Sequence, residues 1–353
     1  MPRGFGRLAK RPLNSSSTTI TTYNTCRIGA GELESSPCTP TATVDFQQPN
    51  DHVALGDLNR DFDGLRAGFG SRNRWGTDEK AIISVLAHRT AAQRSLIRQL
   101  YQQLYGEDLI KLVQSELSGP FERAVSQWIL EPYDREAVMA NVAIVQKEID
   151  FRVIVEIAAS RSSSELLKIK QAYLARYNRS LEEDLLVGLV SSYRYEGREV
   201  ELNLAKSEAK MLKDAIEGKA WSDEDLIRIF TTRSKAQLKA TVNKYNDDYN
   251  TFLTKDLKEN PDDKFLYALR AVIKSIYDPH KYFAKVLRQA IHQKGTDEDA
   301  LTRVIVTRAE FDLKEIQEEF FKRNSVTVDE AIGKVTSGDY KDFILALLGT
   351  GNY

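Results

Sequence analysis

One segment of 15 residues occurs four times in this chain, and this repetition constrains the fold more than any other feature of the sequence. The copies align without gaps and read AHRTAAQRSLIRQLY, ASRSSSELLKIKQAY, TTRSKAQLKATVNKY and VTRAEFDLKEIQEEF. Each copy carries an arginine and, twelve residues later, an aromatic residue; the arginines, spaced 72, 72 and 75 residues apart, are Arg89, Arg161, Arg233 and Arg308. Such self-similarity indicates stacked units that share a core. It predicts one body of four units over residues 57–353.

The spacing of apolar residues predicts that the units are helical. In the first unit, apolar residues recur at helical spacing over 96–104, 109–117 and 121–129. Residues 82–86 have almost no polar face, so a buried central helix is expected there. With a further helix near 57–68, this unit has about five short helices, and no segment of the chain has a strand pattern. The predicted class is all-α, with the repeat arginines paired to acidic residues between helices.

The charge balance of the chain restricts its partners. Lys and Arg number 50 and Asp and Glu number 51, which gives a net charge of −1. No overall field would attract this protein to nucleic acid or to an anionic membrane. Nucleic acid is therefore not an expected partner, and contact with a phosphate-rich surface would need a bridging cation.

Two further observations bear on localisation. No uncharged apolar run approaches the roughly 20 residues of a membrane-spanning helix. The two cysteines, Cys26 and Cys38, both precede the repeats, so no disulfide framework holds the fold. A cytoplasmic protein is expected from this pattern.

The first 45 residues differ in composition from the rest of the chain. They are rich in Ser and Thr, and five basic residues precede Glu32, which is the first acidic residue. Two interpretations fit residues 1–45: a disordered tail, or a transit segment for an organelle. The composition alone favours the tail.

An identical tetrapeptide, Gly-Thr-Asp-Glu, occurs at 76–79 and at 295–298. Capping of a helix by Thr77 and Thr296 would explain the last three residues, because acids suit the positive end of a helix. It does not explain why a glycine comes first. Glycine allows a turn with positive φ, which can direct several carbonyl oxygens to one point. Ca²⁺ binds six to eight oxygens, commonly carbonyls with a carboxylate, and Glu116 follows Gly76 by forty residues.

Together these motifs resemble those of the annexin family. The four repeats, the Gly-Thr-Asp-Glu loop, the repeat arginines and Ser-Glu-Leu-Ser-Gly around Glu116 carry the resemblance, and LVSSYRYEG is similar to plant annexins in particular. The resemblance covers residues 55–350. It implies a curved disc of four helical repeats with Ca²⁺ loops on the convex face. It also implies a non-enzymatic protein, peripheral on membranes, whose Ca²⁺ ions are shared with the phosphates of anionic phospholipid.

The resemblance also implies limits for the four repeats. They are expected at 55–128, 129–200, 201–277 and 280–350. The second is expected to be truncated, because about a dozen residues common in the family are missing after Asp184, which leaves less chain to fill the core there.

Residue by residue, the family's calcium loop transfers best to the first repeat. That loop reads x-Lys-Gly-x-Gly-Thr, and its first residue and both glycines supply carbonyl ligands. The resemblance assigns these roles to Arg72, Arg74 and Gly76, with Glu116 as the carboxylate. Arg74 replaces a glycine, and arginine resists positive φ; residues 68–71 also look like an insertion. Trp75 would contact the membrane interface or pack within the loop.

The fourth repeat departs further from the family's pattern. The carbonyl ligands would be those of Ile291, Gln293 and Gly295, but the acid position is occupied by Val335, which cannot ligate. A weaker site formed by the Thr296 carbonyl and Glu298 is the alternative, with an equivalent at Thr77 and Glu79 in the first repeat. The two middle repeats lack both glycines.

Two other functions compete with membrane binding. His88 lies where plant annexins resemble a proposed peroxidase motif, although a haem ligand needs a pocket. The tripeptide Ile227-Arg228-Ile229 resembles one proposed to bind F-actin, although its isoleucines fit a buried helix face equally well. No phosphate-binding loop of the Gly-x-x-x-x-Gly-Lys-[Ser/Thr] type occurs in the sequence.

Overall fold

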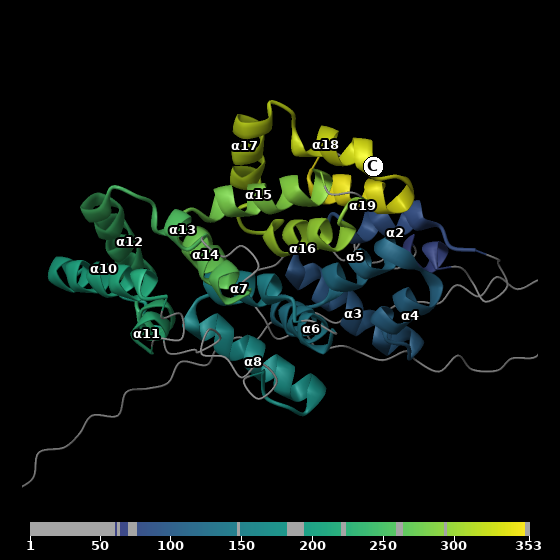
Figure 1. Cartoon of the computed structure of the whole chain (residues 1–353). Coiled ribbons are helices and arrows are strands. Elements are labelled where there is room, and N and C mark those ends of the chain that lie inside the picture. The colour runs from purple at the N-terminus through teal and green to yellow at the C-terminus, as the bar shows by residue number, and fades with distance from the viewer. Residues whose placement is uncertain are drawn as a thin grey trace, which may run out of the picture. The chain divides into compact units, whose positions relative to one another are not determined.

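The computed structural model describes residues 61, 64–69, 76–146, 149–181, 194–219, 224–258, 264–292 and 295–349. Every regular element in these ranges is a helix (Figure 1), which confirms the predicted all-α class. The expectations for residues 1–45, for both cysteines and for the shortened segment after Asp184 fall outside the described residues.

The helices follow the order that the four repeats predict. After a helical segment at 64–68, the first repeat contains α2 (Glu79–Leu86), α3 (Ala91–Tyr105), α4 (Leu109–Glu116) and α5 (Gly119–Ile129). The remaining helices are α6 (Pro132–Val145), α7 (Phe151–Ser160), α8 (Ser163–Tyr177), α10 (Leu202–Glu217), α11 (Glu224–Thr232), α12 (Lys235–Tyr249), α13 (Leu253–Asp256), α14 (Lys264–Tyr277), α15 (Pro279–His292), α16 (Glu298–Arg308), α17 (Leu313–Asn324), α18 (Val328–Val335) and α19 (Gly338–Leu347).

Local signals in the sequence set the ends of these helices. Thr90 caps α3 through a capping box, because its hydroxyl accepts from the Gln93 N–H while the Gln93 side chain accepts from the Thr90 N–H. Gly106 ends the same helix in the left-handed conformation, with φ of 69°. Similar caps allow short helices to follow one another with few linking residues.

The buried faces of the helices join the repeats in pairs. The first repeat packs against the fourth, through α5 on α16 and α19, and the second packs against the third, through α7 on α14 (Figure 1). The short helix α2 is buried on most sides, since Ile82, Ile83 and Leu86 are fully buried. This agrees with the expectation of a central helix there.

Three of the four repeat arginines pair with an acid on the preceding helical segment, as predicted. The pairs are Arg89 with Asp61, Arg161 with Glu136, and Arg233 with Glu208. The acid lies 25 residues before the arginine in the second and third repeats and 28 residues before it in the first. Because each acid is almost completely buried, its charge requires such a partner.

The fourth repeat arginine differs from this prediction. The residue 25 positions before Arg308 is Phe283, and the guanidinium lies over the Phe283 ring at 4.7 Å from its centroid. The ion pair is made instead with Asp312, one turn further along the chain, at 2.5 Å. A cation–π contact has thus taken the place of the carboxylate on the preceding helix.

Arg135 connects three of the repeats. It is 2% exposed, and its guanidinium donates to the carbonyls of Gln127 and Trp128 in the first repeat, of Leu130 just after α5, and of Val306 in the fourth repeat. Burial lowers the pKa of Arg135 to about 10. Its backbone belongs to α6 of the second repeat, so a single side chain holds the first, second and fourth repeats together.

A buried ion pair also joins the second and fourth repeats. Arg303 on α16 donates to Glu156 on α7 at 2.7 Å, and the Tyr282 hydroxyl donates to the same carboxylate at 3.2 Å. None of the helices within the described ranges has the length and apolar character needed to cross a bilayer.

Candidate metal-binding loops

Both predicted loop glycines adopt the conformation that the sequence requires of them. The φ angle of Gly76 is 99° and that of Gly295 is 73°. A Cβ built on either glycine would meet no atom within 4 Å among the described residues beyond its chain neighbours. Backbone conformation, and not lack of space, is therefore the reason for glycine at these positions.

The predicted helix caps are wrong by one residue. Asp78 and Asp297 are the N-cap residues of α2 and α16, and their carboxylates accept from the main-chain N–H groups of Ala81 (3.1 Å) and Ala300 (2.9 Å). The threonine that precedes each aspartate is left outside the helix, because the aspartate already occupies the cap position.

The two threonines use their hydroxyl groups differently. Thr77 donates to the carboxylate of Glu79, so the two residues proposed for the weaker site of the first repeat lie together. Thr296 donates to the main-chain carbonyl of Val335 at 3.3 Å. The loop that contains Gly295 therefore lies against the end of α18.

Glu116 and Val335 occupy equivalent places in their repeats. Glu116 is the last residue of α4, and Val335 is the last residue of α18. Each is followed by two residues in extended conformation and then by a glycine with positive φ, 66° at Gly119 and 63° at Gly338. The contact between Thr296 and Val335 therefore indicates that a carboxylate at the Val335 position, such as Glu116 in the first repeat, lies beside the glycine loop.

Among the described residues, the Glu116 side chain is exposed and has no hydrogen-bonding or ion-pair partner. Within the same residues no cluster of three or more His, Cys, Asp or Glu side chains could hold a metal ion. A cation bound at this loop would therefore be held by main-chain carbonyls together with one carboxylate, as hard cations accept.

The first loop is longer than those of the second and fourth repeats by three residues. In three repeats the aspartate at the start of the second helix donates its main-chain N–H to a carbonyl of the preceding helix; the pairs are Asp78 with Gly68, Asp150 with Ala143, and Asp297 with Ala290. These pairs span ten, seven and seven residues. The separation of Arg89 from Asp61, 28 residues and not 25, agrees with the same insertion.

Several predicted ligands lie outside the described residues. These are Arg72, Arg74 and Gln293, and Trp75, the predicted membrane contact, also lies outside them. Ile291 is described and is buried in the last turn of α15. Glu298 is the first residue of α16, and its main-chain carbonyl accepts from the Tyr340 hydroxyl at 2.9 Å.

The sequence motifs include the glycines at the second loop of each outer repeat, but no role was predicted for them. Gly119 and Gly338 both have positive φ and begin α5 and α19. The signal was present in the sequence, since a Ser-Gly pair occurs at 118–119 and again at 337–338. The second loop therefore has the same sequence pattern and glycine conformation in both outer repeats, as the first loop does.

The residues considered for other functions are also described in part. His88 is exposed, and its Nδ1 lies 3.2 Å from the Ser84 carbonyl oxygen. Arg228 is paired with Asp225 at 2.5 Å, and Ile229 is fully buried. Burial of Ile229 agrees with the packing role that was the simpler interpretation of its tripeptide.

Comparison with known proteins identifies relatives over nearly all of the described chain. The family model for annexins matches residues 70–128, 135–192, 207–272 and 282–347. Annexin-like protein RJ4 from Fragaria ananassa is 54% identical over 286 residues, which are 78% of this chain and 91% of the relative. Annexin D7 from Arabidopsis thaliana is 53% identical over 286 residues, with 78% and 90% covered.

Solved structures agree with the sequence comparison. The structure of an annexin A8 mutant with an intact N-terminus is similar to this one, with a TM-score of 0.78 and 32% sequence identity. The similarity covers 86% of this chain and 97% of that chain.

Proposed function

This chain belongs to the annexin family, and on that premise we propose that it binds anionic phospholipid membranes in a calcium-dependent manner. Calcium-dependent phospholipid binding is known for the family and its fold, and its members are generally non-enzymatic membrane-binding proteins. We propose the same for this chain, acting in the cytoplasm and peripherally on membranes.

One observation carries the proposal for the first repeat. Gly76 has the positive φ that a carbonyl-rich turn needs, and Glu116 ends α4 with an exposed carboxylate that has no partner among the described residues. The equivalent positions of the fourth repeat are in contact, through Thr296 and Val335. We assign the calcium ligands to the carbonyls of Arg72, Arg74 and Gly76 and the carboxylate of Glu116.

The fourth repeat supports a weaker site. Val335 offers no carboxylate to the loop that contains Gly295, although the loop has the same conformation at its glycine. A cation there would rely on the carbonyl of Thr296 and the carboxylate of Glu298. The pair Thr77 and Glu79 provides the equivalent secondary position in the first repeat, where the two side chains are hydrogen-bonded.

Charge supports a bridging role for the cation. With a net charge of −1, the protein gains little from the negative potential of an anionic leaflet. A Ca²⁺ ion held by one carboxylate keeps positive charge and open coordination positions for phosphate oxygens. Trp75, next to the proposed ligands, would place its amphipathic ring at the membrane interface.

Cosedimentation with vesicles tests the proposed function. The full chain is mixed with phosphatidylserine vesicles or with phosphatidylcholine vesicles, in calcium or in chelator. We expect sedimentation only with phosphatidylserine and calcium together. Equal binding in chelator would contradict the calcium mechanism, and equal binding to both lipids would contradict the preference for anionic lipid.

A further inference from the structure

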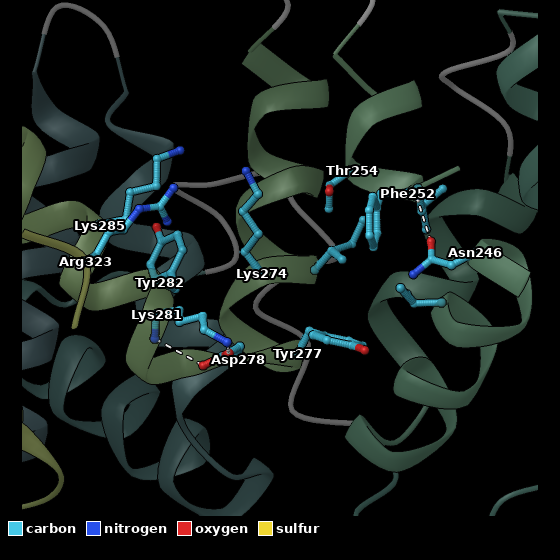
Figure 2. Close-up of a pocket in the computed structure, with 13 residues that line it drawn as sticks. Asn246, Phe252, Thr254, Lys274, Tyr277, Asp278, Lys281, Tyr282, Lys285 and Arg323 are labelled. Carbon is cyan, nitrogen blue, oxygen red and sulfur yellow. Dashed lines mark hydrogen bonds and ion pairs between the residues drawn. The ribbon is translucent and has the colours of Figure 1, made fainter. Parts of the chain in front are cut away.

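A cavity of about 380 Å³ lies between the third and fourth repeats, at the junction of α14 and α15 (Figure 2). Its walls are partly apolar, from Val242, Leu253 and Ile273. Lys274, Lys285 and Arg323 also line the cavity, and Figure 2 shows Lys285 and Arg323 side by side. The basic residues come from three different helices, α14, α15 and α17.

A second cavity of about 420 Å³ adjoins the first and shares Lys281, Lys285 and Arg323 with it. It adds Arg288 to the lining. We call six basic residues the cationic cluster: Lys274, Lys285, Arg288 and Arg323, which line the cavities, and Lys258 and Arg270, whose charges act on Lys274 and Lys285. Lys285 belongs to both cavities.

The charges of the cationic cluster act on one another. Burial, followed by the charges of Lys285, Arg270 and Lys258, lowers the pKa of Lys274 to about 8. Burial also lowers the pKa of Lys285, and the charges of four neighbours add to this effect: Arg270, Arg288, Arg323 and Lys258. Like charges gathered in a partly buried place raise the free energy of the folded protein unless an anion neutralises them.

No carboxylate in the described part of the chain pairs with any member of the cluster. Two carboxylates that line the cavities are already engaged: Asp278 pairs with Lys281 at 2.8 Å, and Glu319 pairs with Lys322 at 2.7 Å. Among the described residues, the Nε atoms of Arg270 and Arg288 are buried and have no hydrogen-bond partner. Buried donors are nearly always satisfied in folded proteins, so Arg288, which lines the second cavity, indicates a missing acceptor there.

We propose that the cationic cluster binds a small anion that carries two or more phosphate groups. Guanidinium and ammonium groups from different helices give the convergent, charge-assisted donors that phosphate oxygens accept. The four positive charges of the cluster that line the cavities exceed what a single phosphate group neutralises, which favours a multiply phosphorylated ligand. The apolar wall of the first cavity leaves room for a non-phosphate part of the ligand.

This site goes beyond the proposed membrane function and is independent of it. The first cavity is lined by Lys281 and Lys285 from the first half of α15 and by Asp278 just before it, and Arg288 extends the cluster along the helix, whereas the candidate calcium loop of the fourth repeat follows the end of the helix, after His292. The cluster shares no residue with the proposed calcium ligands, so we expect binding there with neither calcium nor a bilayer.

Calorimetry with inorganic triphosphate tests the proposal, with the full chain in chelator so that calcium plays no part. We expect saturable binding by the wild type and a raised Tm, because a ligand specific to the folded state stabilises it. Lys285→Gln is expected to weaken binding about tenfold, as the loss of one charge-assisted contact predicts. Without triphosphate, the same variant is expected to melt at a higher temperature than wild type, because repulsion is relieved.

Lys210→Gln is the matched control, since Lys210 is exposed on α10 outside the cluster. Sodium chloride at equal ionic strength controls for screening. Two results would overturn the proposal: no binding of triphosphate by wild type, or equal binding by wild type and Lys285→Gln.

A parallel experiment identifies the source of the phosphate groups, with vesicles that contain phosphatidylinositol bisphosphate in chelator. Vesicle binding that is lost in Lys285→Gln would identify a lipid headgroup as the source. Binding of triphosphate without binding of the vesicles would identify a soluble ligand.

Discussion

The Thr296 hydroxyl donates to the main-chain carbonyl of Val335, across 39 residues of sequence and at 3.3 Å. This hydrogen bond joins the glycine loop of the fourth repeat to the end of α18, where the family pattern expects an acid. The fourth repeat therefore has the backbone arrangement of the candidate site without its carboxylate. In the first repeat the equivalent residue is Glu116.

Val335→Glu should supply the missing ligand. The Val335 side chain is 38% exposed, so a longer polar side chain can enter solvent without a burial cost. We expect the calcium concentration for half-maximal vesicle binding to fall by about threefold to tenfold, since ligand charge sets the affinity of calcium sites. Val335→Gln is the control of equal size, and an equal shift in both variants would argue against a new carboxylate ligand.

Arg135→Met should destabilise the repeat assembly. The variant removes the Arg135 donor from the buried carbonyls of Trp128 and Val306 and from the part-buried carbonyl of Gln127. We expect the free energy of unfolding to fall by about 3 kcal/mol, the cost of several lost buried hydrogen bonds less the gain in apolar burial. Urea denaturation measures it. Arg198→Met, at an exposed position, should change stability by less than about 0.5 kcal/mol.

The cationic cluster should make stability depend on pH in an alkaline window. The pKa of Lys274 is lowered from 10.5 to about 8 in the folded protein. Between these pH values the unfolded chain binds more protons than the folded protein, so this residue makes the free energy of unfolding rise with pH. Beside burial, the charges that lower the pKa of Lys274 are those of Lys285, Arg270 and Lys258, while Asp278, which lines the same cavity, is paired with Lys281.

Denaturation of wild type and Lys274→Met checks this dependence. The difference in stability between them should favour the variant near neutral pH and shrink as the pH rises from about 8 towards 10.5. A difference that stays constant over this window would show that Lys274 is not under repulsion in the folded protein.

Much of the fold could be predicted because helical periodicity and the repeated register are local properties of the sequence. The short helix around Ile82 and the ion pairs of Arg161 and Arg233 follow from them. The partners of Arg308 do not follow from them. Phe283 occupies the position of the expected carboxylate, and Asp312, which pairs with Arg308 instead, comes after the arginine and not on the preceding helix.

The conformation of the glycines in the candidate site could be predicted from the sequence, but the contacts around them could be predicted only in part. The positive φ of Gly76 and Gly295 follows from the repeated tetrapeptide. The cap at Asp78 was missed because threonine and aspartate are both good N-cap residues, and only the backbone path decides between them. The cationic cluster could not be predicted, since its residues come from separate helices that only tertiary packing brings together.

A calcium titration of vesicle binding by Glu116→Gln tests the central claim most directly. Wild type and the variant are compared on phosphatidylserine vesicles, with Glu318→Gln, an exposed carboxylate on α17, as the matched control. We predict that Glu116→Gln needs roughly tenfold more calcium for half-maximal binding, because the only carboxylate of the first site is lost, and that Glu318→Gln behaves as wild type. Superimposable titrations of wild type and Glu116→Gln would contradict the assignment of Glu116 as the calcium ligand.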